Sequence, residues 1–409
     1  MNDKIPAIRI KPYHKEWKKS KLKEVANVYD GVHKTPKYLD EGIMFLSVED
    51  IDTLQSNKFI AREDFKKDFK VYPQKGDVLM TRIGDVGTPN VVSTNELVAY
   101  YVSLALIKPF NMDPCFLSNC ICSNSFKKGL KERTLTTAVP QKINKNQIGE
   151  IEIIYTEDIE EQKSIGESFS SLDYLITLHQ RKYDKFVATK KALIEKIFPK
   201  KASNVPQLRF KGYESPWQKK TLGKIGTTYT GLSGKTKDDF GHGEARFVTY
   251  VNVFKNPIAD IKGVDFVEID DSQNIVKNGD VLFTTSSETP EEVGMSSVWL
   301  GDTENTYLNS FCFGYRLFSS EKIDPLYLAY LLRSPEVRKE FQFLAQGISR
   351  YNISKTKVMD IVLSVPEDYE EQVKIGKLFF NLDKLIELTQ KKYEKLESLK
   401  KAMLNKMFV

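Results

Sequence analysis

The 409-residue sequence is poor in the residues that build disulfide networks and metal sites, with only four cysteines and four histidines. Four cysteines are too few for a disulfide scaffold and indicate a reducing compartment, so we expect a cytoplasmic protein. No run of about 18 apolar residues occurs, and the first residues lack the apolar stretch of a secretion signal. We therefore expect neither export nor contact with a membrane. With 61 basic and 55 acidic residues the formal charge is +6, which permits nucleic-acid binding without demonstrating it.

Recognisable catalytic motifs are also missing. The stretch 231–236, GLSGKT, resembles the end of a phosphate-binding loop, but Tyr229 stands where the first glycine of that motif is required. The G-x-G at 241–243 has no dinucleotide-binding continuation, and Cys120 and Cys122 have no second pair with which to hold zinc. No nucleophile with a neighbouring base is apparent. We expect a protein with no catalytic residue and no metal site.

What the sequence does contain is a duplication. Three segments recur in order: 8–31 as 208–231, 75–81 as 278–284, and 155–199 as 365–409. The last pair is the closest, with 22 of 45 positions identical without gaps. Between these segments the two halves differ freely. A common frame therefore surrounds two divergent bodies, which we place at 1–156 and 204–366.

The closing segment of each half, 157–203 and 367–409, predicts a long helix. Apolar or long side chains recur at alternating spacings of four and three over about five heptads, which is typical of a coiled-coil seam. The seam residues are Ile165, Phe169, Leu172, Ile176, Ile375, Phe379, Leu382 and Ile386. Some 40 residues would make a rod of roughly 60 Å. We predict that the two helices pair antiparallel with pseudo-two-fold symmetry; the alternative is that each packs only on its own body.

Four leucines lie off this seam, at positions 175, 178, 385 and 388. They form a second apolar flank, which is either core or a docking surface for another protein.

Both bodies have the pattern of an α/β (α+β) fold with short, mixed strands. Alternating apolar and β-branched residues predict strands over 42–51, 76–83, 90–94, 100–110, 245–254, 279–286 and 307–318. Helical spacing predicts helices over 114–131 and 324–345.

Several loops of each body mix basic, hydroxyl and amide side chains with glycine, which suits contacts to phosphates and to base edges. The alternative interpretation of any one of these segments is an ordinary solvated loop without a binding role. Charge is uneven, at +5 for residues 1–156 and −1 for 204–366. The second body therefore needs specifically placed contacts, or partners that supply positive charge, to bind DNA.

The duplicated frame resembles the DNA-specificity subunit of type I restriction-modification systems. The resemblance rests on the opening strips 8–22 and 208–222, on the helix starts EDIEEQKSIGESFSSLD (157–173) and EDYEEQVKIGKLFFNLD (367–383), and on KGDVLMTRIG and NGDVLFTTS. It departs in one place, where the first strip begins Ile8-Arg9-Ile10 instead of LRF. It implies two target-recognition domains that each read one half of a bipartite double-stranded DNA target, held apart by spacer helices.

The resemblance also implies partners: two methyltransferase subunits and two motor-nuclease subunits. S-adenosylmethionine, ATP and Mg²⁺ would belong to those partners, with no cofactor on this chain. Three alternatives remain open: a catalytic restriction or methylation enzyme, a specificity subunit for a fused nuclease-methyltransferase, and a coiled-coil protein adaptor without DNA contact.

On this reading, the loop after a strand and the loop before the long helix should face the major groove in each body. The candidate DNA-binding residues are Lys34, Thr35, Lys37, Arg82, Gln141, Lys142, Asn144, Lys235, Thr236, Lys237, Thr285, Ser286, Ser349, Arg350 and Asn352. Arg82 and Arg350 are the strongest candidate base readers, because a guanidinium can engage both acceptors of guanine. The lysines, Lys235 among them, are expected to hold phosphates.

Overall fold

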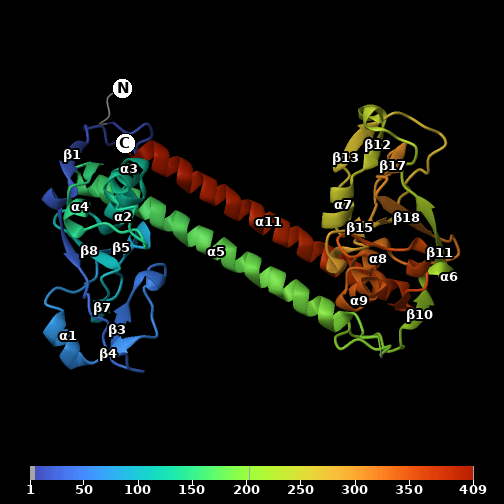
Figure 1. Ribbon diagram of the computed structural model, residues 1–409, viewed down its shortest axis with the longest axis horizontal. Coiled ribbons are helices and arrows are strands. Elements are labelled where there is room, and N and C mark those ends of the chain that lie inside the picture. Colours follow the sequence, from blue (N-terminus) through green and yellow to red (C-terminus); the bar gives the residue numbers. More distant parts are fainter. Residues whose placement is uncertain (1–4, 202, 409) are drawn as a thin grey trace. The chain divides into compact units, whose positions relative to one another are not determined.

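The computed structural model describes residues 5–201 and 203–408, and the chain divides into two compact units. Unit 1 comprises the residues up to Arg181 together with those from Gln390 onward, and unit 2 comprises Lys182–Thr389. The division falls within the two long helices, so each unit holds one mixed body, the first part of one long helix and the last part of the other (Figure 1).

The body of unit 1 is built on a four-stranded antiparallel sheet and a smaller three-stranded sheet. The large sheet has the order β2 (Ala26–Asp30), β8 (Leu104–Pro109), β5 (Val78–Ile83), β6 (Asp85–Val91), and the small one β4 (Phe59–Ile60), β3 (Ile43–Leu46), β7 (Val98–Tyr100). A further pair joins β1 (Lys18–Lys21) to β9 (Glu152–Tyr155). The short helices are α1 (Arg62–Asp68), α2 (Pro114–Cys122), α3 (Asn124–Arg133) and α4 (Lys145–Gly149).

The body of unit 2 repeats these three sheets and adds one short strand pair. Its large sheet is β11 (Gly226–Thr230), β18 (Cys312–Leu317), β14 (Val281–Thr284), β16 (Ser296–Val298), and its small sheet is β13 (Val264–Val267), β12 (Phe240–Val248), β17 (Thr306–Leu308). Two pairs complete it: β10 (Gln218–Thr221) with β20 (Val362–Val365), and β15 (Ser286–Ser287) with β19 (Tyr351–Asn352). The helices are α6 (Leu222–Ile225), α7 (Tyr250–Lys255), α8 (Pro325–Leu331), α9 (Pro335–Leu344) and α10 (Lys355–Val358).

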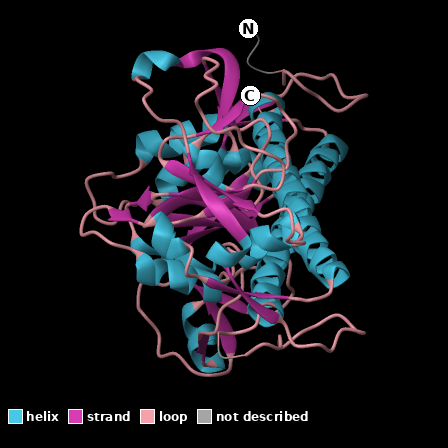
Figure 2. Ribbon diagram, turned by 90° about the vertical axis from the view of Figure 1, so that its right-hand side faces the viewer, coloured by secondary structure: helices cyan, strands magenta, loops and turns pink. Residues whose placement is uncertain are grey.

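The matching strand orders confirm the predicted duplication and the mixed fold class. Figure 2, in which the body of unit 2 faces the viewer, shows short strands among short helices and loops. The small sheet of each body combines one parallel and one antiparallel pairing, which the duplication also repeats.

The two long helices are α5 (Ile159–Ile197) and α11 (Tyr369–Met407), each 39 residues long. They run antiparallel wherever they meet within a unit (Figure 1). In unit 1 Asp173 of α5 accepts an ion pair from Lys400 of α11, and in unit 2 Asp383 of α11 accepts one from Lys190 of α5. These pairs are the same contact in two copies, because positions 173 and 383, and 190 and 400, correspond in the repeat. The predicted antiparallel pairing of the helices is therefore confirmed within each unit, and the same contact recurs in both.

Aromatic side chains fix the helix ends into the cores. In unit 1 Phe408 lies against Trp17, Phe116 and Phe169, with ring centroids 5.4–6.0 Å apart. The equivalent Phe198 in unit 2 stacks on Phe379 at 5.6 Å.

The predicted seam residues differ in burial along the helices. Ile165, Phe169, Ile375 and Phe379 are completely buried, and Leu172 and Leu382 nearly so. Ile176 and Ile386 are only half-buried.

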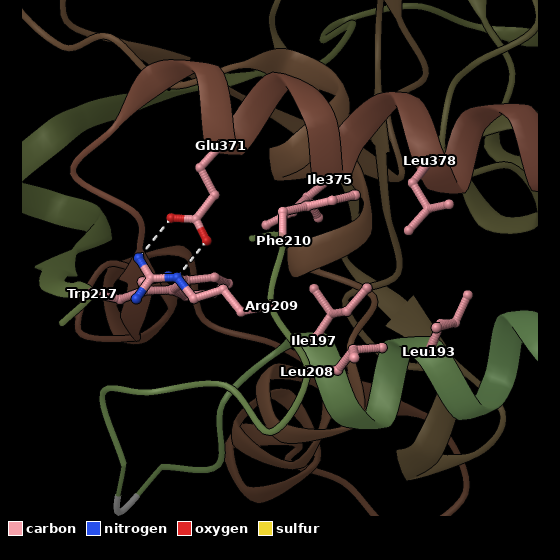
Figure 3. Close-up of a pocket in the computed structure, with 9 residues that line it drawn as sticks. All are labelled: Leu193, Ile197, Leu208, Arg209, Phe210, Trp217, Glu371, Ile375 and Leu378. Carbon is pink, nitrogen blue, oxygen red and sulfur yellow. Dashed lines mark hydrogen bonds and ion pairs between the residues drawn. The ribbon is translucent and has the colours of Figure 1, made fainter. Parts of the chain in front are cut away.

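The shared sequence motifs have structural roles at the start of each long helix. Arg9 donates two hydrogen bonds to the fully buried carboxylate of Glu161, at 2.6 and 2.8 Å, and Arg209 does the same to Glu371 at 2.7 and 2.8 Å (Figure 3). The hydrogen bond to Glu371 raises the pKa of Arg209. Each pair ties the opening strip of a body to its helix.

Two further motif positions hold the same junction. Gln162 and Gln372 each accept from the backbone N–H before a short helix and donate to the carbonyl just before the long one. A Cβ on Gly166 or Gly376 would lie within 3 Å of the residues that begin α2 or α8. The glycine of the I-G motif is thus required by close packing between helices.

The structure corrects several predicted elements. The helices predicted over 114–131 and 324–345 are each two helices, because Ser123 and Ser334 are extended. Ser123 accepts from the N–H of Phe126 and so starts a new helix, whereas Ser334 precedes a proline, which disfavours the helical conformation.

Several predicted strands also differ. The strand predicted over 42–51 ends at Leu46, and only the first two residues of the one predicted over 90–94 belong to β6, which begins at Asp85. The predicted strand 245–254 ends at Val248, because Thr249 caps helix α7. Strands predicted over 100–110 and 307–318 each divide in two around a turn. Among the described residues no helix is long and apolar enough to cross a membrane, and no group of three or more His, Cys, Asp or Glu side chains is placed to hold a metal.

We predict that Phe169→Asp combined with Phe379→Asp lowers the free energy of unfolding by several kilocalories per mole, because each change buries a charge without a partner. Urea unfolding followed by circular dichroism measures this. The control is Tyr174→Asp with Leu388→Asp, two exposed positions on the same helices, where we expect about 0.5 kcal/mol or less. Equal stability of the Phe169/Phe379 variant and the wild type would contradict the packing described above.

Candidate nucleic-acid interface

In unit 1 two loops distant in sequence are joined at one edge of the large sheet. The turn between β5 and β6 meets the segment 135–143, since the N–H of Gly84 donates to the carbonyl of Gln141 (2.9 Å) and that of Ile143 to the carbonyl of Arg82 (3.0 Å). The segment closes on itself through a bond from the Leu135 N–H to the Lys142 carbonyl at 2.8 Å. We call this pair of segments the reading loops of unit 1.

Unit 2 repeats the arrangement. Here the turn after β14 pairs with residues 346–353, since Ser286 lies opposite Asn352 and the Ile353 N–H donates to the Thr285 carbonyl at 3.0 Å. Two backbone bonds between Gln346 and Asn352, at 2.8 and 3.0 Å, close the second segment. These are the reading loops of unit 2. The structure thus brings together in each body the two loops that the sequence proposed as one surface.

Topology brings a third loop to the same edge. Strands β2 and β5 are both antiparallel to β8, so they are parallel to each other and their carboxyl ends lie at one edge of the sheet. The same holds for β11 and β14 beside β18. The loop containing Lys34, Thr35 and Lys37, which are all exposed, therefore begins beside the reading loops.

Arg82 has a different environment from that expected of a base reader. Its side chain is 5% exposed, pairs with Asp30 and donates to the Ile143 carbonyl at 3.1 Å. Burial lowers the pKa of its guanidinium. Arg82 therefore serves to bind three segments of the fold together, whereas Gln141, Lys142 and Asn144 around it are exposed.

Arg350 lies in an exposed segment and has few protein partners. Its Nε and Nη2 donate to the hydroxyl of Ser286 at 3.3 and 3.1 Å, and its guanidinium lies 5.8 Å from the centroid of the Phe311 ring. Ser349 and Asn352 beside it are exposed, whereas the Thr285 hydroxyl donates to the Phe311 carbonyl at 2.7 Å. Arg350 is oriented by weak contacts and retains donors for a ligand.

The loop after β11 is more internally bonded than its counterpart after β2. Lys235 pairs with Asp270 at 2.7 Å, and this hydrogen bond raises the pKa of the lysine. Thr236 caps a short turn by hydrogen bonding to Asp239. Lys237, the third candidate in this loop, is exposed and has no ion pair among the described residues. The expected phosphate contact of Lys235 would require Asp270 to release it.

A groove in unit 1 adds residues that the sequence analysis missed. It runs from the β5–β6 turn to α3 and is lined by Thr88, Lys127, Lys131, Thr134, Thr136 and Gln141, among others. Lys127 and Lys131 are four residues apart, so they lie on the same face of the helix. The run of lysines in α3 is the sequence signal that could have identified this groove.

Helix α9, the counterpart of α3 in unit 2, has no equivalent face of free basic residues. On α9 the guanidinium of Arg338 donates to the carbonyls of Glu291, Val293 and Gly294, and burial lowers its pKa to about 10. Lys339 of the same helix pairs with Glu336. The two bodies therefore carry the same loop frame with different chemistry.

Comparisons with known proteins agree with this architecture. Residues 14–186 and 214–398 match the family described as type I restriction modification DNA specificity domain. A putative type I restriction enzyme MjaX specificity subunit of Methanocaldococcus jannaschii is 28% identical over 188 residues, 44% of this chain and 42% of that protein. The type I restriction enzyme MjaVIII specificity subunit of the same organism is 26% identical over 293 residues, 68% and 65% of the two chains.

The matched regions thus span less than two thirds of the length of either relative. In fold, the crystal structure of the S subunit of a type I restriction-modification system from M. genitalium aligns over 99% of both chains, with a TM-score of 0.58 and 14% identity.

Two copies of one mixed body, each joined to antiparallel helices and each presenting differently composed reading loops, define a class of duplicated, two-domain scaffold proteins. The chain belongs to the type I restriction-modification DNA specificity family, since both family matches together span most of its length. The resemblance inferred from its sequence motifs is therefore confirmed.

We predict that Arg82→Ala lowers the free energy of unfolding by about 1–3 kcal/mol, because it removes a buried hydrogen-bonded group and leaves Asp30 without its cation. Arg350→Ala should leave the unfolding free energy within about 0.5 kcal/mol of the wild type, because its donors meet only one hydroxyl. Urea unfolding of the two variants side by side measures both. Equal losses would contradict the separation of a structural from an exposed arginine.

Proposed function

We propose that this chain is the non-catalytic, sequence-reading subunit of a type I restriction-modification complex, and that each body reads one half of a bipartite DNA target. The observation that carries the proposal is the repeated loop frame with different side chains. Positions 83 and 286, and 142 and 352, correspond in the two bodies, where Ile83 faces Lys142 and Ser286 faces Asn352. Two unlike half-sites need two unlike surfaces on one scaffold.

The exposed reading-loop residues are proposed to contact bases. These are Gln141, Lys142, Asn144, Ser349, Arg350 and Asn352, and their amide, hydroxyl and guanidinium groups match base edges in the major groove. Thr35 would add a hydroxyl contact, whereas the hydroxyls of Thr236 and Thr285 donate within the protein and the buried Ser286 accepts from Arg350, so these three would act by holding the loops. Lys34, Lys37 and Lys237, with Lys127 and Lys131 of the groove, are proposed to hold phosphates and so supply affinity without sequence information.

The helices are proposed to set the spacing between half-sites. At about 1.5 Å per residue, a 39-residue helix is about 58 Å long, which is a little under two turns of B-DNA at about 34 Å per turn. The exposed leucines off the seam, Leu175, Leu385 and Leu388, are proposed to dock two methyltransferase subunits, after which two motor-nuclease subunits would join. S-adenosylmethionine, ATP and Mg²⁺ would be bound by those partners.

The main test exchanges residues 24–156 for the corresponding segment of another family member. The full chain with its methyltransferase subunits is expressed, and methylated adenines are mapped by single-molecule sequencing. We expect one half of the methylated motif to change and the other half to persist, because the two bodies carry separate reading loops. A change in both halves, or methylation without a bipartite motif, would contradict independent reading.

For Arg350 we predict a loss of about 1–3 kcal/mol in binding to the target duplex on substitution by alanine, with relaxed preference at one base pair. Binding to a set of single-substitution duplexes measures this. Arg350→Lys is the matched control: it retains the charge but not the two-pronged donor geometry, so preference should also relax while the salt dependence stays unchanged. Full base discrimination by Arg350→Ala would rule out this role.

A further inference from the structure

In each body one of the two reading loops has at its tip an aliphatic side chain that the rest of the described protein leaves exposed. Val139 is 99% exposed and Ile348 is 96% exposed, the two highest values among the large hydrophobic residues that the structure describes as exposed. One lies in each body, although the two loop sequences differ. Leaving a branched aliphatic side chain in water gives up the stabilisation that its burial would provide.

Backbone hydrogen bonds fix the conformation of the loop that carries each tip residue. Val139 lies within the segment closed by the Leu135–Lys142 bond, and Ile348 within the one closed by the Gln346–Asn352 pair. Gly347 makes the second closure possible, because its φ of +140° and a Cβ position only 2.1 Å from the Arg350 carbonyl exclude any other residue. The tips are therefore presented by fixed loops.

The surroundings of each tip indicate what it contacts. Gln141 and Lys142 follow Val139, and Arg350 and Asn352 follow Ile348, so every tip shares its loop with donors suited to base edges. In unit 2 two aromatic side chains, Phe311 (56% exposed) and Phe343 (87%), extend the apolar character of a body whose net charge is −1. In the unit 1 repeat, Ser103 and Glu132 occupy the corresponding positions.

We propose that Val139 and Ile348 each contact the C5-methyl group of a thymine in the half-site read by their body. The methyl of thymine is the one apolar group on the major-groove edges of the base pairs, and apolar side chains are the groups that read it. This inference rests on the proposed function, because it assumes that the reading loops face DNA. It adds that each half-site contains at least one A·T pair next to the bases read by Gln141 and Lys142 or by Arg350 and Asn352.

The test uses the full chain in complex with its methyltransferase subunits and the motif obtained from methylated adenines. Each thymine of the target duplex is replaced in turn by deoxyuridine, which removes only the methyl group. We expect one replacement in each half-site to weaken binding about fourfold, which corresponds to the burial of one methyl group.

A double-substitution cycle assigns the contact. With Ile348→Ala the deoxyuridine effect should vanish in the half-site of unit 2 and persist in that of unit 1, and Val139→Ala should give the reverse. Ile261→Ala, an exposed aliphatic residue outside the reading loops, is the matched control and should preserve both effects.

The outcomes separate the inference from the function on which it rests. A wild-type complex that binds its target specifically but is indifferent to every thymine methyl, or a half-site without an A·T pair, overturns the inference alone. Loss of subunit assembly in Ile348→Ala, with the methyl effect intact, would also overturn it and show that the tip contacts a protein. Absence of sequence-specific binding by the wild-type complex would instead refute the proposed function.

Discussion

The packing of Phe408 against Trp17, Phe116 and Phe169 is the constraint on which the rest of unit 1 depends. It places the last residues of the described chain in the core that the first residues begin, so α11 must end where α5 starts. Phe198 and Phe379 impose the same condition in unit 2. Because protein interiors are densely packed, removing an aromatic ring from either core would leave a cavity. Within each unit the end of one long helix must therefore lie beside the start of the other, which makes the two helices antiparallel.

Around these cores the shared motifs form a rigid junction. The Arg9–Glu161 and Arg209–Glu371 pairs bury a carboxylate with its two oxygens satisfied, which is the condition under which a buried charge is tolerated. The G-D motif acts similarly, since Asp77 and Asp280 accept bonds from the turn before their strand and pair with Lys108 and Arg316. The identical residues of the two halves thus build the frame, and the divergent residues occupy the loops that the frame presents.

The two presented surfaces differ in the forces available to them. Unit 1 has exposed lysines on the loop after β2 and on α3, whereas the basic residues of α9 in unit 2 are engaged by carbonyls or by Glu336. Unit 2 offers instead an exposed arginine beside exposed aromatic and aliphatic side chains. The composition of the first surface is suited to long-range attraction of phosphates, and that of the second to short-range contacts.

The sequence by itself determined the duplication, the mixed fold class and the two long helices, because repeated motifs and heptad spacing are local signals. It also proposed that the two loops of each body form one surface, because both combine basic, hydroxyl and amide side chains. Only the tertiary structure decided the state of individual side chains: Arg82 and Arg350 look alike in sequence, but Asp30 and the Ile143 carbonyl surround the first and solvent surrounds the second. Likewise Lys235 forms an ion pair with Asp270, 35 positions away. The predicted helix 114–131 is interrupted at Ser123, which caps the next helix, and the predicted helix 324–345 at Ser334, which precedes a proline. Burial and ion pairing depend on residues distant along the chain, so the spacing of residues within one segment does not predict them.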